Sequence, residues 1–413
     1  MGEHDGRTAS SRGVPGGVVL GLVLTSTMAV GTLAPFALAA LAPFILDDLE
    51  FSRTQYGSLI TVYFLVGALI SPSVGSVVDR LGGWLMMLVL IVVSVVSFAV
   101  MAGVPSYLWL MVAMVLAGLA NALVNPTTNQ VIGAHVTPGR RGVIVGVKQS
   151  GVQAGAALSG LALPALAVLL GWRPSLLVCA AVTAALAVLA WVVRPPAHRG
   201  HRAVTREPVR WAGSQVRWLV VYAFLMGAGV AVANTYVVLF AHEGLELSEA
   251  WAGRTLGVLG AASVVARILW ARRAERTANP SRALTQIAGI AAVSSGLFWL
   301  APAMGGQAAL WTAVLLVGAS AAAWNSVGML AVIDGNDGAT MGRASGNVLA
   351  GFFAGNVVSP AAVGALVDRT GSYEPAWAVT VAIFVAAGVV AAGQQRRVRR
   401  AAQPDSGAER TGR

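Results

Sequence analysis

One lysine stands out among the ionisable residues of this 413-residue chain. Lys148 is the only lysine among 28 lysine and arginine residues, and it lies inside the apolar stretch 143–168. It stands about five residues into that stretch, so a helix would bury its ammonium roughly 8 Å deep. A charge at such a place either binds a ligand or snorkels back to the surface. Arginine snorkels equally well, so the choice of lysine favours binding.

Amide side chains accompany this lysine. Gln149 and Gln153 are four residues apart, which puts them on one face of a helix. A second polar stripe, in the stretch 107–133, consists of Asn121, Asn125 and Thr128, with Asn129 beside it. These amides either line a substrate cavity or form hydrogen bonds that hold helices together. The same two interpretations apply to Asn325, Asn347, Asn356 and Tyr236; Arg254 either binds substrate or anchors a helix at an interface.

The sequence offers no support for enzyme chemistry. All five histidines lie in terminal segments or between apolar stretches, and the pair His198 and His201 lacks further metal ligands nearby. No glycine-rich loop of the ATP-binding kind is present, and the single cysteine, Cys179, excludes a disulfide within the chain. We therefore predict no enzymatic activity, no cofactor, no bound metal and no nucleic-acid ligand.

The composition is that of a polytopic membrane protein. Hydrophobic residues make up 56% of the chain and charged residues 11%, with a mean hydropathy of +0.73. A soluble domain carries roughly a quarter charged residues, and one membrane span needs about 20 apolar residues. We predict an all-α membrane protein with twelve transmembrane helices, at 18–44, 55–77, 85–104, 107–133, 143–168, 175–193, 217–241, 251–270, 283–303, 308–332, 344–367 and 375–393.

The distribution of arginine predicts the orientation of these spans. With both termini in the cytoplasm, 24 basic residues fall on the cytoplasmic side and 4 outside. Acidic residues divide almost evenly, so the asymmetry follows the positive-inside rule. We therefore expect a multi-pass protein of the cytoplasmic (inner) membrane, with both termini in the cytoplasm.

Internal similarity divides the spans six and six. At a constant offset of 200 residues, Gly118 matches Gly318 and Asn125 matches Asn325, with five further matches through Gly171 and Gly371. Two parallel repeats imply a substrate site near the midplane between them. We expect a cytoplasmic tail at 1–17, a six-helix bundle at 18–193, a basic cytoplasmic linker at 194–216, a second bundle at 217–393 and a basic cytoplasmic tail at 394–413.

A loop motif names a family. After the second span the chain reads Gly75-Ser-Val-Val-Asp79-Arg80-Leu-Gly82, which resembles the signature loop of the major facilitator superfamily. The resemblance covers roughly residues 15–395. It implies a bacterial transporter of this fold, whose loop latches the outward-open state against the start of helix 11. The implied latch residues are Gly75, Asp79, Arg80 and Gly82, with Arg267, Glu275 and Arg276 as a second copy after the eighth span.

Other residues agree with the family pattern, depart from it or bear on the branch of the family. The run from Gly364 to Tyr373 resembles the end of helix 11 in many bacterial members. Met114 stands where drug/proton antiporters carry an arginine, and Gly83 and Trp84 stand where the signature loop usually has basic residues. The run Lys148-Gln-Ser-Gly151 resembles members near the cyanate and nitroimidazole carriers.

The charges inside the spans predict the class of solute. No span interior contains Asp or Glu, so a cationic substrate has no deep counter-charge. We predict a secondary active or facilitative transporter of a small polar solute, an organic anion, working by alternating access as a monomer in the lipid bilayer. Coupling to a proton stays open. The alternatives are multidrug efflux by proton antiport and a membrane receptor or scaffold that transports nothing.

Overall fold

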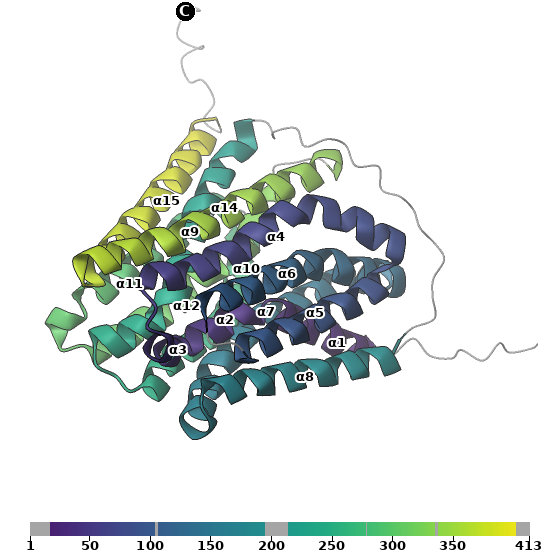
Figure 1. The fold of residues 1–413 in the computed structure, drawn as a ribbon. Coiled ribbons are helices and arrows are strands. Elements are labelled where there is room, and N and C mark those ends of the chain that lie inside the picture. Colours follow the sequence, from purple (N-terminus) through teal and green to yellow (C-terminus); the bar gives the residue numbers. More distant parts are fainter. Residues whose placement is uncertain (1–16, 104–105, 195–213, 278, 335–337, 402–413) are drawn as a thin grey trace, which may run out of the picture.

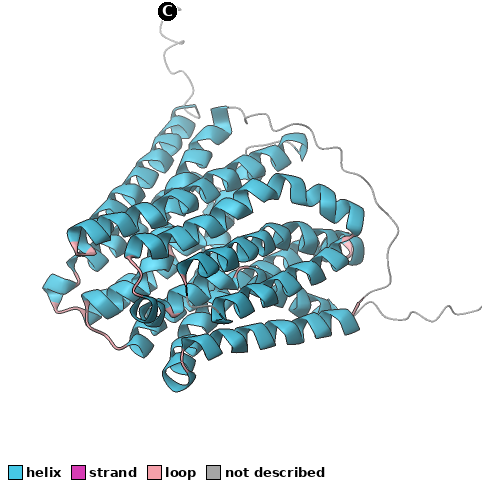
Figure 2. Cartoon of the chain, viewed as in Figure 1, coloured by secondary structure: helices cyan, strands magenta, loops and turns pink. Residues whose placement is uncertain are grey.

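The computed structural model describes residues 17–103, 106–194, 214–277, 279–334 and 338–401, and within these it contains helices and no strand (Figures 1 and 2). The early helices are α1 (Gly17–Gly31), α2 (Leu33–Ala40), α3 (Ala42–Leu49), α4 (Arg53–Leu81), α5 (Gly83–Gly103), α6 (Tyr107–His135), α7 (Pro138–Leu170) and α8 (Trp172–Val192). Then follow α9 (Ser214–Leu239), a π-helix (Phe240–Gly244), α10 (Glu249–Thr277), α11 (Pro280–Leu300), a 3₁₀ turn (Pro302–Met304), α12 (Gln307–Ala319), a 3₁₀ turn (Ala321–Ala323), α13 (Trp324–Asp334), α14 (Gly338–Thr370) and α15 (Glu374–Ala401).

The number of apolar helices agrees with the twelve expected spans. In the described residues, eleven helices or continuous helical segments are long and apolar enough to cross a membrane, and the bent pair α1–α2 brings the number to twelve. The expected tail at 1–17 and linker at 194–216 lie almost entirely outside the described residues, as does the end of the tail at 394–413. The first part of that tail is helical, because α15 continues to Ala401.

Two prolines break the first span, which the sequence predicted as one stretch over 18–44. The axes of α1 and α2 differ by 56°. Pro35 has no N–H for the carbonyl of Gly31 and its ring clashes with that carbonyl, so the helix cannot continue through this point. Pro43 stands in the same relation to Ala39, and α2 ends at Ala40. The first span is therefore three short helices.

The tenth span is also broken, at Ser320, between α12 and the 3₁₀ turn before α13. A break inside an apolar bundle leaves carbonyls that need donors from elsewhere. Trp270 Nε1 donates to the carbonyl of Ala319 over 2.8 Å, and Arg267 Nη2 donates to that of Ala322 over 3.2 Å. Helix α10 thus satisfies the backbone of its broken neighbour.

The helix bounds repeat along the chain at nearly constant offsets. Helices α7 and α14 each have 33 residues, and both ends of α14 lie 200 positions after those of α7. Helices α4 and α10 have 29 residues each at an offset of 196, and α5 and α11 have 21 each at an offset of 197. This agreement extends the glycine and asparagine matches to whole helices. We call α1–α8 the N-half and α9–α15 the C-half.

The two halves pack closely at one end of the bundle. This end holds the start of α4, the end of α9 and the end of α14, and we call it the Arg53 end; the opposite end, where α4 stops, is the Asp79 end (Figure 1). Glycines permit the approach. A Cβ added at Gly364 of α14 would lie 2.2 Å from the carbonyl oxygen of Arg53, and one at Gly160 of α7 would lie 2.2 Å from the backbone nitrogen of Gly257 in α10.

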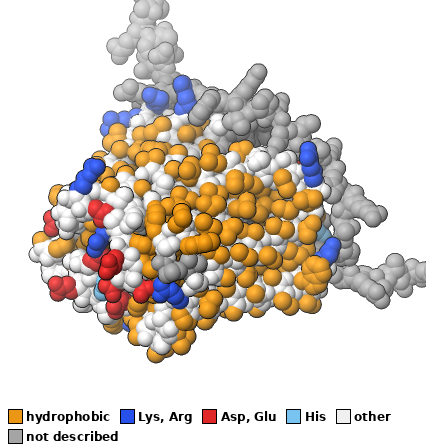
Figure 3. Space-filling view, viewed as in Figure 1, with side chains coloured by type: hydrophobic (Ala, Val, Ile, Leu, Met, Phe, Trp, Pro, Cys, Tyr) orange, Lys and Arg blue, Asp and Glu red, His pale blue; other side chains and the backbone are white. Residues whose placement is uncertain are grey.

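The visible surface fits a membrane environment. Hydrophobic side chains cover the middle of the bundle, and Asp and Glu side chains gather at the left, which is the Arg53 end (Figure 3). Large apolar side chains on this and other faces are well exposed, among them Leu69, Leu169 and Val192. Such a surface needs lipid to cover it.

Candidate functional site

The ammonium of Lys148 is enclosed by three neutral acceptors. Lys148 Nζ donates to Thr128 Oγ1 and Asn129 Oδ1, each over 2.7 Å, and to Asn125 Oδ1 over 3.4 Å. The side chain is 1% exposed. Helix α7 begins at Pro138, ten residues or about 15 Å before Lys148, and its apolar part of membrane length begins at Ile144. The predicted polar stripe of α6 and the predicted lysine of α7 therefore meet.

This contact fixes how the asparagines present their amides. Asn125 and Asn129 are both exposed, although they lie within a span. Their oxygens accept hydrogen bonds from Lys148, and no acceptor among the described residues binds their NH₂ groups, which can therefore donate elsewhere. Lys148 is thus a buried positive charge, and the NH₂ groups of Asn125 and Asn129 are exposed donors in front of it.

The other predicted polar residues of the N-half lie around this cluster. Asn121 faces α4, because a Cβ at Gly67 would lie 3.0 Å from its Nδ2 atom. Gln149 is half-buried, and Gln153 is buried at 6% exposure. The backbone of Gln153 packs against α10, since a Cβ at Gly260 would lie 2.9 Å from its carbonyl oxygen.

A row of aromatic rings crosses between the halves near the middle of α4 and α14. The ring of Phe64 lies 6.3 Å from that of Phe353, centroid to centroid, and Phe353 lies 5.9 Å from Phe352. Phe352 in turn lies 5.5 Å from Trp324. We call these four residues the aromatic row. None of the four was among the predicted site residues, since an aromatic residue in a span carries no distinguishing signal.

The predicted amides of the C-half divide into satisfied and unsatisfied groups. Asn356 Nδ2 donates to the carbonyl of Phe352 over 2.8 Å and so supports α14 itself. Asn325 Oδ1 and Asn347 Nδ2 are buried atoms without a hydrogen-bond partner among the described residues, and Asn347 is 7% exposed. Unsatisfied buried amides cost free energy, so they indicate room for a polar partner.

Two predicted binding residues lie away from this region. Tyr236 Oη donates to the carbonyl of Pro360 over 2.6 Å and lies 3.1 Å from the carbonyl of Arg53, which places it in the contact between the halves. Arg254 is exposed and stacks 4.1 Å over the ring of Trp251. The surroundings of Arg254 fit the interfacial anchor that the sequence left open.

The signature loop after α4 contacts its own half in the described residues. Gly75 is buried, while Asp79 and Arg80 are exposed, and Gly82 ends the helix with φ of 90°. Gln130 Nε2 donates to Asp79 Oδ1 over 3.3 Å from within the same half. In the predicted second copy Arg276 is exposed, and the side chain of Glu275 lies outside what the structure describes. Arg267 instead donates a hydrogen bond to the carbonyl of Ala322 at the break of the tenth span.

The segment Gly364-Ala-Leu-Val-Asp368-Arg369-Thr-Gly371 repeats the signature pattern at the other end of the bundle. The backbone N–H groups of Arg53 and Thr54 donate to the Asp368 carboxylate over 2.9 and 2.8 Å, and Thr54 Oγ1 donates to it as well. These donors are the first N–H groups of α4, which need a partner and favour a negative charge. A carboxylate of the C-half therefore caps a helix of the N-half.

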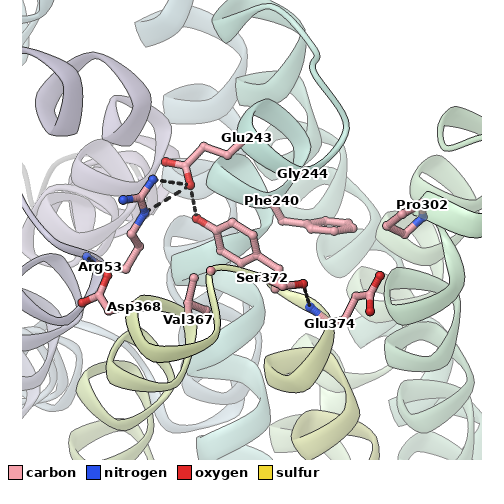
Figure 4. A pocket seen from close by; sticks show the side chains of 11 residues that line it. Arg53, Phe240, Glu243, Gly244, Pro302, Val367, Asp368, Ser372 and Glu374 are labelled. Carbon is pink, nitrogen blue, oxygen red and sulfur yellow. Dashed lines mark hydrogen bonds and ion pairs between the residues drawn. The ribbon is translucent and has the colours of Figure 1, made fainter.

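An ion pair reinforces this cap at the Arg53 end (Figure 4). Arg53 Nη2 lies 2.9 Å from Glu243 Oε2, and Tyr373 Oη donates to the same oxygen over 2.6 Å. Burial raises the pKa of Tyr373, and the Glu243 carboxylate raises it further, so the phenol keeps its proton. These residues border a pocket of about 430 Å³. We call the group of Arg53, Glu243, Asp368 and Tyr373 the seal.

The seal was not predicted from the sequence, although its pattern was noticed as a family resemblance. The repeated Asp-Arg-x-Gly was the available signal. Its partner, the start of α4, lies more than 300 positions away along the chain, as the contact from Asp368 to Arg53 shows.

Comparison with known proteins agrees with the resemblance seen in the sequence. The model of the Major Facilitator Superfamily matches residues 19–346. A hexuronate transporter of Bacillus subtilis is 34% identical over 140 residues, which are 34% of this chain and 33% of the relative. A class C tetracycline resistance protein of Escherichia coli is 27% identical over 320 residues, covering 72% of this chain and 76% of the relative.

A solved structure shares the fold. The crystal structure of a bacterial homologue of the human lysosomal transporter Spinster superposes with a TM-score of 0.76 at 16% identity, over 92% of this chain and 97% of that one. The family match covers well over half of the sequence, and the helices, their repeats and the superposition agree with it. The chain belongs to the Major Facilitator Superfamily, a family of membrane transporters.

Proposed function

We propose that this protein is a secondary transporter that moves a small polar solute, an organic anion, across the cytoplasmic membrane by alternating access. The observation that carries the proposal is the buried ammonium of Lys148, whose hydrogen-bond partners in the described part of the chain are all neutral. Helices α6 and α7 contain no Asp or Glu. A cation in a medium of low dielectric attracts an anion strongly, and binding the anion offsets the cost of burying the charge.

The state described here supplies one conformation of the cycle. The seal holds the halves together at the Arg53 end, with further hydrogen bonds from Tyr56 to the carbonyl of Thr235 and from Thr61 to that of Val357. In our proposal the Arg53 end faces outward and both termini lie in the cytoplasm, because basic residues gather on the other side. This state is then the one closed to the outside.

The finer features follow from the same proposal. The six-helix bundles at 18–193 and 217–393 move against each other as a monomer around the central site, as parallel repeats do in this fold. Any coupling proton rides with the substrate or on a group other than a carboxylate inside the spans. The run from Lys148 to Gly151 supports a place near the cyanate and nitroimidazole carriers. Chemistry on the substrate has no part in the proposal.

Multidrug efflux by proton antiport is the second candidate, and the aromatic row favours it. Phe64, Phe352 and Phe353 offer the apolar surface that a lipophilic drug needs. The similarity to a tetracycline resistance protein is compatible with it. A lipophilic cation, however, would meet the uncompensated charge of Lys148. The third alternative, a receptor or scaffold, predicts binding without transport.

The test is transport by purified protein in proteoliposomes. Radiolabelled glucuronate, chosen because of the hexuronate-transporting relative, and benzoate serve as anionic probes, and tetraphenylphosphonium serves as the cationic probe. We expect uptake of at least one anion, loss of that uptake in Lys148→Gln, and partial uptake in Lys148→Arg, where the charge survives with altered geometry. Uptake of the cation alone, at equal rates in wild type and Lys148→Gln, would establish drug efflux instead.

A further inference from the structure

We infer that the anion carries an aromatic body: its carboxylate binds the amides of Asn125 and Asn129, and its ring lies against the aromatic row. This inference rests on the proposed function and names the substrate class of the same site. It follows from where donors and rings stand relative to each other along α4 and α6, and from how differently the two halves are lined.

The donor side of the site is built by Lys148 without direct contact to a ligand. At 1% exposure its ammonium cannot reach a solute, and its three N–H bonds already point to Thr128, Asn125 and Asn129. The asparagine oxygens are thereby occupied, and their NH₂ groups remain as donors on exposed side chains. Hydrogen bonds from such donors to an oxyanion, with a positive charge behind them, are of the strong, charge-assisted kind.

The aromatic row and the two asparagines lie about 10 Å apart along the bundle axis. Asn121 contacts α4 at Gly67, three residues after Phe64, and the backbone carbonyl of Tyr63 lies against Gly118. Helices α4 and α6 are therefore in register with Phe64 level with Gly118, seven residues before Asn125. Seven residues correspond to about 10 Å along a helix. A carboxylate attached to one or two fused rings spans much of this separation. The remaining distance is bridged by the side chains that reach toward the ligand, with Asn121 between the two levels.

The facing side of the site is apolar where the N-half is polar. The offset of 200 that relates α7 to α14 and α6 to the tenth span allows a position-by-position comparison. Apart from Asn125, which is matched by Asn325, five polar residues of the N-half cluster and its surroundings are each replaced by a residue with an apolar side chain or none. The replacements are Lys148 by Val348, Gln149 by Leu349, Gln153 by Phe353, Thr128 by Gly328 and Asn129 by Met329.

Two open polar atoms interrupt this apolar side. Asn347 Nδ2, in a side chain only 7% exposed, and Asn325 Oδ1, beside Trp324, have no partner among the described residues. They can bind a polar substituent on the ring. The contact between Phe64 and Phe353 joins the two halves, so a ring bound there touches both bodies that move during transport.

A thermal-shift titration of the purified full-length protein tests the inference with four probes of matched shape or charge. The probes are 1-naphthoate, glucuronate, neutral 1-naphthamide and cationic 1-naphthylmethylammonium. Stabilisation rises with ligand concentration over its dissociation constant. We expect 1-naphthoate to bind at least about tenfold more tightly than the other three, since one aromatic contact and one charged hydrogen bond each contribute about that factor.

Variants assign the two ends of the ligand. Phe353→Leu and Phe64→Leu remove a ring with little loss of volume and should weaken 1-naphthoate about tenfold, and glucuronate by a clearly smaller factor, because glucuronate has no ring to stack. Trp109→Leu, an exposed ring near the other end of α6, is the matched control and should change nothing. Asn129→Asp places a carboxylate against Lys148 and should abolish binding of 1-naphthoate. Lys148→Met should also lose this binding, whereas Lys148→Arg should keep part of it.

The possible outcomes distinguish a failure of this inference from a failure of the proposed anion transport. If glucuronate binds as tightly as 1-naphthoate and Lys148→Gln weakens both, the aromatic body is wrong and anion transport stands. If only the naphthyl cation binds, and Lys148→Gln leaves it unaffected, both fall. Size-exclusion profiles of every variant guard against reading misfolding as lost binding, and a misfolded Phe353→Leu is replaced by Phe353→Met.

Discussion

The segments Gly75–Gly82 and Gly364–Gly371 share the pattern Gly-x-x-x-Asp-Arg-x-Gly and stand at opposite ends of the bundle. Both finish on a glycine with positive φ, 90° at Gly82 and 65° at Gly371. Asp368 accepts three hydrogen bonds from the start of α4, in the other half. Both aspartates are exposed, but among the described residues Asp79 accepts one hydrogen bond, of 3.3 Å and from within its own half.

Asp368 shows what the pattern does at the Arg53 end. An aspartate at the end of one helix caps the start of a helix in the opposite half, where free N–H groups and the helix dipole favour it. Asp368, at the end of α14, caps the start of α4. By the family resemblance, Asp79, at the end of α4, would cap the start of α14 in the other state. We propose that the two latches are reciprocal and engage alternately.

The largest effect is expected from Asp368→Asn. It removes the charge that holds the Arg53 end closed, and should shift the equilibrium toward opening there by about 1–3 kcal/mol, or roughly 5- to 150-fold. The measurement is maleimide labelling of a Thr61→Cys probe in a Cys179→Ala background, since Thr61 is bonded across the halves to Val357. Unchanged labelling in a well-folded variant would show that the cap does not control closure.

A change at Asp79 should act with the opposite sign. Asp79→Asn weakens the other latch by a similar or smaller amount, about 1–3 kcal/mol, and should slow transport without unfolding the protein. Introduced into Asp368→Asn, it should lower the labelling of Thr61→Cys back toward the wild-type value. Labelling that rises further in the double variant would contradict reciprocal latches.

Glu243→Gln should have a smaller effect than either aspartate variant. Arg53 and Glu243 are partly exposed, 39% and 23%, and ion pairs of this kind contribute about 0.2–1 kcal/mol. Labelling of Thr61→Cys should rise at most about fivefold. Glu243→Ala serves as comparison. A rise in labelling as large as that of Asp368→Asn would mean that the ion pair, and not the Asp368 cap, controls closure.

The smallest effect concerns pH. The raised pKa of Tyr373 means that its hydrogen bond to Glu243 is fully present below the ordinary phenol value of 10.0 and is lost only as pH rises beyond it. The ratio of labelling between Tyr373→Phe and wild type should therefore stay constant between about pH 6 and 9. A ratio that falls toward one within this window would mean that the phenol ionises there.

Much of the fold could be predicted from the sequence, because apolar runs of membrane length are strong signals. The breaks were missed: Pro35 and Pro43 could have revealed the first, but nothing local marks Ser320. The stripe containing Asn125 and the inward position of Lys148 were predicted separately, whereas their contact depends on how α6 and α7 pack. Likewise, Arg267 follows the pattern of a latch residue, yet its neighbour is the open backbone of Ala322.

Counterflow in proteoliposomes tests the central claim most directly, because it requires both an anion site and alternating access. Vesicles loaded with unlabelled 1-naphthoate or glucuronate are diluted into a trace of the labelled anion. We predict transient accumulation of label by wild type, none by Lys148→Gln, and a slower rise with Asp79→Asn. No accumulation of either anion, together with counterflow of tetraphenylphosphonium that Lys148→Gln leaves intact, would contradict the account.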